Sequence, residues 1–579
     1  MNDQKIENLL NLALEATPEE REESLRLSEG YDKTEQTWDL IVKYNGDLKV
    51  LNREGVSFVP LINEYAIVTI QERLISWLAA QTEIEYVEKP KRLFFAVNQG
   101  KAASCVLGLE NPPYNLTGKE ILIAILDSGI DFTHPDFIKE DGTTRIVAIW
   151  DQGVSGTPPE GYRIGTEFTQ NEINQALEGI RQGRTSSKVL NTRDLSGHGT
   201  AVAGIAAGNG RASEGRYRGM APDSELLVVK LGVPRPDSFP RTTELMQAVD
   251  YVVRKALELK MPLVINLSFG NVYGSHDGTS LLETFLDDIS NYGRTVIVAG
   301  TGNEGEAAGH TGGNLTAGET KEIELAVGEY ETSINVQLWK SYTDEISVYL
   351  ISPEGRTVGP VQEKLGAQRF LTGGTELLVY YGEPSPYSMS QEIYMDFLPK
   401  STYIDSGVWK IRLVPGKLVE GRYDLWLPGA GELNRDTRFY LPSPETTLTI
   451  PSTARNVISV GAYDSSLMSY APFSGRGYTR DNREIKPDLS APGVNVRTTA
   501  PGGGYTTVTG TSFATPFVSG TAALLQQWGI VDANDPYLYG AKVKAYLIKG
   551  ARHLPGFEVW PNRKLGWGAL CVSESLPKR

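Results

Sequence analysis

The chain has 579 residues, of which 71 are acidic and 56 are basic, so its formal net charge is −15 at pH 7. An acidic surface of this kind repels nucleic acid and anionic membranes, and neither is an expected partner. No apolar run reaches the roughly 18 residues that a membrane-spanning helix needs. The length allows about four domains of roughly 150 residues each.

The two cysteines, Cys105 and Cys571, are too few for a disulfide framework. They could form a single bond, but nothing in the sequence supports it. Two free, largely buried thiols are the simpler expectation. Neither cysteine has a histidine motif in its context that would indicate a cysteine nucleophile.

The N-terminal stretch, MNDQKIENLLNLALEATPEEREES, is amphipathic and acidic. It lacks the basic start, long apolar run and small-residue cleavage site of a signal peptide, which predicts synthesis in the cytoplasm. Residues 1–35 are expected to form a mobile or helical arm. The compact unit that follows is predicted to have strands at 37–44, 56–70 and 84–96 and a helix at 71–81.

Beyond residue 100, apolar strands alternate with helical stretches. Strands are predicted at 121–127, 225–231, 262–269 and 295–300, and helices at 200–208, 242–259 and 279–291. Near-continuous apolar strands separated by helices are typical of an α/β fold with a parallel sheet covered on both faces. In such a fold the reactive groups belong at strand ends and helix starts.

Between about residues 314 and 447 the pattern changes to short alternating strands divided by Gly, Pro and Asp. About seven such strands predict an antiparallel β-sandwich inserted into the α/β domain. Trp339, Trp409 and Trp426 lie within these strand patterns, where aromatic side chains usually belong to the core.

Three short motifs contain the residue types that acyl transfer by serine needs. An apolar strand runs into Asp127 in ILIAILDSGIDF, and His198 stands between two glycines in DLSGHGTAVAG. Ser512 lies at the start of a small-residue helix in VTGTSFATPFVSGTAA, where we expect Pro516 in the first turn. A lone serine at a helix start is most often a cap, but a base and an orienting carboxylate elsewhere favour a nucleophile.

These motifs, in the order Asp, His, Ser, resemble those of the subtilisin-like serine proteases (subtilases). The resemblance implies a triad of Asp127, His198 and Ser512, with Asn303 of VIVAGTGNEG in the oxyanion hole. It also implies that VINLSFG lines the primary specificity pocket and pairs with an extended substrate. The substrate-binding residues implied there and nearby are Ser268, Phe269, Gly270 and Gly300.

Two positions depart from common subtilases, which carry further histidines where this chain has Ala201 and Phe517. Neither position belongs to the triad, so the predicted activity is unaffected.

The unit ahead of residue 100 resembles a subtilisin propeptide, which acts as an intramolecular chaperone with its C-terminal tail in the active-site cleft. An unrelated small α/β module is the alternative. A propeptide should be removed by self-cleavage in the flexible run AVNQGKAAS. We favour the bond between Gln99 and Gly100, which would place Gln99 in the primary pocket.

A subtilase with a propeptide, no signal peptide and a sandwich before the Ser motif resembles the clostridial spore-germination (Csp) subtilases. That resemblance implies a serine endopeptidase that activates or degrades a protein substrate. It also implies a jelly-roll-like sandwich, a propeptide retained as a non-covalent partner, and a later location in the spore or released from the cell. The alternative is a sensor or interaction protein in which proteolysis is limited to self-cleavage.

The predicted domains are 1–99 (arm and propeptide), 100–313 and 451–579 (catalytic domain), and 314–450 (sandwich). No cofactor is expected. The other histidines have no cysteine or second histidine nearby, so no zinc site is predicted; they are His134, His276, His310 and His553. Asp136 resembles a calcium ligand of secreted subtilisins, but the loop GNGRASEGRYRGMAP lacks the asparagine-rich calcium pattern, and no metal is predicted.

Overall fold

The computed structural model describes residues 5–18, 30–61, 64–89, 96–183, 190–232 and 240–577. The chain divides into two compact units, residues 1–95 and 96–579. Helix α4 (Ala96–Ala103) belongs to the second unit, so this division falls a few residues before the predicted domain boundary at 99.

The N-terminal unit is a five-stranded antiparallel sheet in the order β1-β2-β4-β3, with β5 pairing β2. The predicted strand at 37–44 is β2, and the predicted arm contains α1 (Asn8–Glu15), whose Leu10 and Ala13 are buried in the core. The last strand is shorter than predicted, and residues 90–95 lie outside the described part of the chain. The other elements are β1 (Tyr31–Asp32), β3 (Val56–Leu61), β4 (Tyr65–Gln71), β5 (Ile84–Glu88) and α3 (Ile75–Ala79).

The second unit is built on a nine-stranded sheet in the order β24-β23-β11-β10-β6-β9-β7-β8, with β25 pairing β23. The central strands are parallel, and β8 and β24 add antiparallel edges. The bounds are β6 (Leu122–Asp127), β7 (Ile146–Asp151), β8 (Thr166–Thr169), β9 (Glu225–Lys230), β10 (Leu263–Leu267), β11 (Thr295–Gly300), β23 (Ile458–Asp464), β24 (Ser469–Tyr470) and β25 (Leu489–Pro492).

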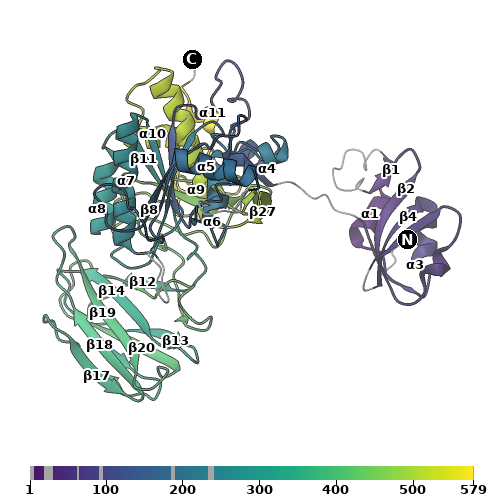
Figure 1. Ribbon diagram of the computed structural model, residues 1–579. Helices are drawn as coiled ribbons and strands as arrows, with labels where there is room; N and C mark the ends of the chain where they lie inside the picture. Colours follow the sequence, from purple (N-terminus) through teal and green to yellow (C-terminus); the bar gives the residue numbers. More distant parts are fainter. Residues whose placement is uncertain are drawn as a thin grey trace. The chain divides into compact units, whose positions relative to one another are not determined.

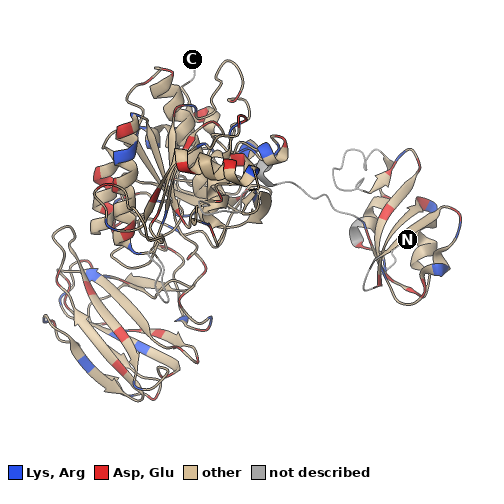
Figure 2. Ribbon diagram, viewed as in Figure 1, with Lys and Arg blue, Asp and Glu red and all other residues tan. Residues whose placement is uncertain are grey.

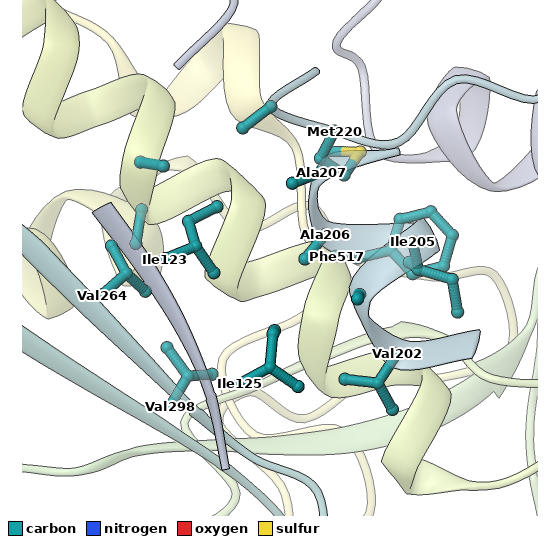
Figure 3. Packing of buried hydrophobic residues seen from close by; sticks show 14 of the residues in the cluster. Ile123, Ile125, Val202, Ile205, Ala206, Ala207, Met220, Val264, Val298 and Phe517 are labelled. Atoms are coloured by element: carbon teal, nitrogen blue, oxygen red, sulfur yellow. The ribbon is translucent and has the colours of Figure 1, made fainter. Parts of the chain in front are cut away.

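Helices cover both faces of this sheet, as the apolar strands predict (Figure 1). On one face, residues of α6 (His198–Ala207) and α9 (Thr511–Gln526) pack against the strands; Val202, Ile205 and Phe517 belong to the same buried cluster as Ile125 (Figure 3). On the other face lie α7 (Thr242–Leu259) and α8 (Leu281–Ser290). The remaining helices are α5 (Gln170–Arg181), α10 (Ala541–Gly550) and α11 (Val572–Ser575).

The inserted region forms two antiparallel sheets around one apolar core, so the predicted β-sandwich is confirmed. Trp409 and Trp426 are fully buried as predicted, whereas Trp339 is half-buried. One sheet contains β12 (His310–Asn314), β14 (Ile334–Ser341), β17 (Gln368–Thr372), β18 (Thr375–Tyr381), β19 (Ser390–Pro399) and β21 (Arg422–Trp426). The other contains β13 (Lys321–Val327), β15 (Ile346–Ile351), β16 (Thr357–Val358), β20 (Gly407–Pro415) and β22 (Arg438–Phe439).

Charged residues of both signs are interspersed along the strands of the sandwich and the helices around the nine-stranded sheet (Figure 2). On β13 and β20, Lys410 pairs with Glu324 and Arg412 pairs with Glu322 across the strands. These pairs are partly exposed, and each contributes little to stability. Within the described residues, no helix combines the length and apolar character needed to cross a membrane.

Cys105 and Cys571 form a disulfide, with Cα atoms 4.9 Å apart, so the expectation of two free thiols was wrong. The two cysteines are 466 residues apart in sequence. They meet because the segment after α4 lies beside the start of α11, where the Val572 N–H donates to the Ser104 carbonyl at 2.9 Å. The bond therefore ties the start of the second unit to its C-terminal end.

Candidate active site

Asp127 and His198 meet at the carboxyl edge of the sheet. Asp127 is the last residue of β6, and His198 is the first residue of α6. The His198 Nδ1–H donates to Asp127 Oδ1 at 2.7 Å, and the Ser128 N–H donates to the same oxygen. This bond fixes the imidazole so that Nε2 is the free acceptor in the neutral ring.

The electrostatic surroundings favour the protonated form of His198. Burial lowers the pKa of His198, but the Asp127 carboxylate and, more weakly, Asp194 outweigh it, so the pKa is raised above its ordinary value. The Phe513 ring lies against the imidazole, with centroids 5.2 Å apart. Because Phe513 directly follows Ser512, this contact places the first turn of the helix that carries Ser512 beside His198.

A second buried carboxylate, Asp194, holds the start of the His198 helix. Its Oδ2 accepts from the Thr200 N–H and hydroxyl, and its Oδ1 accepts from the Gly197 N–H and the Ser128 hydroxyl. Asp194 thus satisfies backbone donors that a helix start leaves unpaired. Sequence reasoning did not assign it a role, although it opens the quoted motif DLSGHGTAVAG.

Close backbone packing brings the His198 helix onto the turn after Asp127. A Cβ at Gly199 would lie 2.1 Å from the Gly129 carbonyl oxygen, so only glycine allows this approach.

Ser512 is the second residue of α9, and Pro516 is the sixth, beyond the first turn in which it was expected. Proline has no N–H to donate to the carbonyl four residues earlier, which is that of Ser512. That carbonyl instead accepts from the Ser268 hydroxyl at 2.9 Å. Pro516 therefore leaves the Ser512 carbonyl free to accept a hydrogen bond that ties this turn to the segment after β10.

In this structure the Ser512 hydroxyl donates to the Ser268 carbonyl at 2.9 Å. Ser268 is held in turn by Asn266, whose amide donates to the Ser268 hydroxyl at 2.9 Å and accepts from Ser519 at 2.8 Å. Asn266 and Ser519 are fully buried, and they lock β10 to α9. Asn266 and Ser268 both lie in VINLSFG, but the motif does not show that they bond to the distant helix α9.

Asn303 is placed beside the N-terminus of α9. Its Oδ1 accepts from the Thr511 N–H at 3.1 Å and from the Thr511 hydroxyl at 3.2 Å. The Nδ2 group is consequently turned toward Gly510, whose Cβ, if present, would lie 3.5 Å from it. The amide can thus donate into the space in front of Ser512.

The predicted substrate-binding residues lie at the ends of two neighbouring strands. Ser268, Phe269 and Gly270 follow β10, and Gly300 ends β11. Gly300 packs against α9, since a Cβ there would lie 2.8 Å from the Thr515 hydroxyl oxygen. The predicted cleavage bond, Gln99–Gly100, lies within α4, where a Cβ at Gly100 would lie 2.5 Å from the Phe517 ring.

The Asp136 carboxylate is hydrogen-bonded by groups of the chain itself. It accepts from the Ala212 N–H and the Tyr505 hydroxyl, both at 2.8 Å. The Arg145 guanidinium, which is buried, donates to the carbonyls of Asp136, Ala207 and Ser224. Burial lowers the pKa of Arg145 to about 10, which leaves it charged at neutral pH. The Arg145 guanidinium therefore satisfies these three main-chain carbonyl oxygens.

We expect Arg145→Met to destabilise the protein by about 2 kcal/mol or more, because the buried carbonyls of Ala207 and Ser224 lose their bonds from Arg145 at about 1 kcal/mol or more each, while that of Asp136 keeps a bond from the Asn209 N–H. Urea unfolding of the Ser512→Ala background, which prevents self-digestion, measures this. Arg211→Met is the matched control, since that arginine is exposed. EGTA should leave the wild-type Tm unchanged; a large EGTA-induced drop would contradict this account.

Elsewhere in the described ranges, no group of three or more His, Cys, Asp or Glu side chains is arranged to hold a metal ion. His276 and His310 stack on Trp426, with ring centroids 4.2 and 4.6 Å away. Burial lowers the pKa of His276 to about 4, so it is neutral at physiological pH. Both histidines are packed into the junction of the sandwich with the catalytic unit.

Comparison with known proteins places the chain in a family. The model of the subtilase family matches residues 118–390 and 435–568. The chain belongs to the subtilase family. A second model, that of the Csp protease B prodomain, matches residues 4–91, so the N-terminal unit is a prodomain of the Csp type.

Among solved structures, the subtilase is similar to the CspB protease of Clostridium perfringens, with 38% identity, a TM-score of 0.76, and coverage of 83% of this chain and 97% of that one. Among curated proteins it is 25% identical to the minor extracellular protease Vpr of Bacillus subtilis over 79% of this chain. It is also 25% identical to the PII-type proteinase of Lactococcus lactis over 74%. The chain spans 52% and 24% of the lengths of these two relatives.

Proposed function

We propose that this subtilase is a serine endopeptidase in which Ser512 attacks the peptide bond, His198 is the general base and Asp127 orients it. The observation that carries the proposal is the 2.7 Å bond between Asp127 and His198 at the start of a helix packed on the Ser512 helix. A carboxylate, an imidazole and a hydroxyl in this order are what nucleophilic acyl transfer requires.

The proposed reaction begins when the Ser512 hydroxyl turns from the Ser268 carbonyl to His198 Nε2 and loses its proton there. The Ser512 oxygen adds to the substrate carbonyl carbon, and the carbonyl oxygen becomes an oxyanion. Asn303 Nδ2 and the Ser512 N–H donate to that oxyanion. His198 then passes its proton to the leaving amine, and a water molecule hydrolyses the acyl-enzyme by the same steps in reverse order.

The substrate is proposed to be a protein or peptide bound in an extended form along Ser268–Gly270. The prodomain is the first such substrate, cut at Gln99–Gly100 and retained afterwards as a non-covalent partner. Because that bond is helical in this structure, the segment must unwind to reach Ser512. The match to the Csp-type prodomain supports a role in spore germination, in which the enzyme activates a protein substrate. The enzyme is proposed to be made in the cytoplasm and later placed in the spore or released.

Labelling with a fluorophosphonate tests the proposed nucleophile. The full chain should gain one phosphonyl adduct on the peptide that contains Ser512, and His198→Ala should label far more slowly. An adduct on another serine, or none, would refute the assignment. A chain that labels but cleaves only its own prodomain would favour the sensor or interaction function over a general endopeptidase.

Asn303→Leu should lower kcat by about 10²–10³-fold with little change in KM, because the amide stabilises the oxyanion and not the ground state. This magnitude is that of the equivalent change in subtilisin, another member of the family. Steady-state kinetics on a peptide substrate measures it, with the exposed Asn314→Leu as control. An unchanged kcat would remove Asn303 from the oxyanion hole.

A further inference from the structure

A cavity of about 340 Å³ lies where the inserted sandwich meets the rest of the second unit. Its volume falls within the range of small-molecule sites in proteins. One wall comes from β12 and β21 of the sandwich. The others come from the segment 443–446, which returns from the sandwich, and from Asn482 and Arg563. The cavity is separate from the active site, because neither Ser512 nor His198 belongs to its lining.

The acidic group on the sandwich wall, Asp424, is already fully paired. Its carboxylate accepts from Arg422 Nε at 2.9 Å and from Arg480 Nε at 3.1 Å, and His310 Nε2 lies 3.2 Å from its other oxygen. Burial raises the pKa of Asp424, but His310 and the two arginines outweigh it, so the pKa is lowered. Asp424 is therefore charged at neutral pH and needs no further cation.

Arg422, by contrast, is only partly used by this pairing. Its Nε donates to Asp424, whereas its two Nη groups make no hydrogen bond to any residue that the structure describes. The Arg422 side chain lines the cavity and is 25% exposed, so these donors can be reached. The flat fork of a guanidinium matches the paired oxygens of a carboxylate or a phosphate.

Arg563 brings a second guanidinium to the cavity from the side opposite the sandwich in sequence. Its Nη1 donates to the Gly477 carbonyl at 3.0 Å and its Nη2 to Asn482 Oδ1 at 3.3 Å. It also lies 4.7 Å from the centroid of the Tyr478 ring. These contacts hold the guanidinium in place but leave some of its N–H donors unused. The Asn482 amide, which also lines the cavity, adds a neutral donor.

The surroundings of the cavity are positively charged, although the whole chain carries a formal net charge of −15. Glu445, the other acid of the lining, lies 3.8 Å from both Arg476 and Arg563, which is too far for a hydrogen bond. Among the described residues, the lining side chains and their ion-pair partners thus include four arginines and two carboxylates. A hollow with an excess of positive charge attracts anions.

We propose that this cavity binds a small anion with carboxylate or phosphate groups, held by Arg422 and Arg563 with the Asn482 amide beside them. The ligand contacts β21 of the sandwich and two loops outside it, so its binding stabilises the junction between these parts. The site takes no part in peptide-bond cleavage. The proposal therefore stands independently of the proposed protease function.

Isothermal titration calorimetry on the full-length Ser512→Ala chain tests the proposal at constant ionic strength, with inorganic phosphate and citrate as separate probes. At least one probe should bind saturably at millimolar concentrations or below, with one ion per chain. Tighter binding of phosphate would identify a phosphorylated ligand, and tighter binding of citrate a carboxylic acid. Arg563→Gln should weaken the binding about tenfold or more, because it removes a charged hydrogen-bond donor.

Arg422→Gln should weaken the binding to a similar extent. Because Arg422 also bonds the buried Asp424, circular dichroism must show that this variant is folded; if it is not, Arg563→Gln decides alone. Arg412→Gln is the matched control, since that arginine lies on the other sheet of the sandwich, paired with Glu322, and its loss should leave the affinity unchanged. The proposal is overturned if neither probe binds saturably, or if Arg563→Gln binds as tightly as the parent chain.

Discussion

His198→Ala should lower kcat by about 10⁶-fold, the loss found for the equivalent histidine of subtilisin. Asp127 holds the His198 imidazole by a 2.7 Å hydrogen bond. Without that imidazole, no base is in place to take the proton of Ser512. Steady-state hydrolysis of a peptide substrate measures the change, and circular dichroism confirms that the variant is folded.

The matched control is His553→Ala. That histidine is exposed and stacks on Trp560, with ring centroids 4.4 Å apart. Its replacement should leave kcat unchanged. A His198→Ala enzyme that retained more than a small fraction of the wild-type rate would show that another group acts as the base.

Asp127→Asn should lower kcat by about 10⁴-fold at neutral pH, as in other enzymes with this triad, because the amide stabilises the wrong imidazole tautomer. It should also change the pH profile. In wild type, activity needs neutral His198, whose pKa is raised, so the acid limb should have its midpoint above 6.5. Without the Asp127 charge, burial lowers the pKa of His198, and the midpoint should move to lower pH.

The measurement is kcat/KM between pH 5 and 9 for wild type, Asp127→Asn and the control Asp141→Asn. Asp141 is exposed and accepts hydrogen bonds from the N–H and hydroxyl of nearby Thr143. The control should reproduce the wild-type curve. An acid limb that stayed in place in Asp127→Asn would mean that Asp127 does not control the protonation of His198.

The sequence was most informative where local pattern and fold agree. Continuous apolar strands such as 121–127 and 295–300 could only be buried in a parallel sheet, and the structure places them there. The placement of Asp127 and His198 followed from the same logic, since strand ends and helix starts meet at one edge of such a sheet. The inserted sandwich could equally be predicted from its short alternating strands.

Features that depend on contacts between distant segments could not be predicted from the sequence. Cys105 and Cys571 are joined only because distant segments run side by side. Thr449 packs against Gly270 and Gly302, which are its neighbours only in three dimensions. No sequence motif singled out Arg145, which the fold surrounds with three carbonyl groups. In each case the decisive neighbour belongs to another part of the chain.

Pro516 shows the opposite failure, in which a local rule was applied to the wrong position. A proline near a helix start was expected in the first turn, but it lies further in. The Ser512 carbonyl, which has no helical N–H to accept from, accepts from the Ser268 hydroxyl instead.

The central claim is that Ser512 is the nucleophile of a self-processing peptidase, and the intact masses of wild type and Ser512→Ala test it most directly. Wild type should be two fragments cut between Gln99 and Gly100, and Ser512→Ala a single chain of 63.4 kDa. Two full-length chains, or two chains cut alike, would contradict the claim.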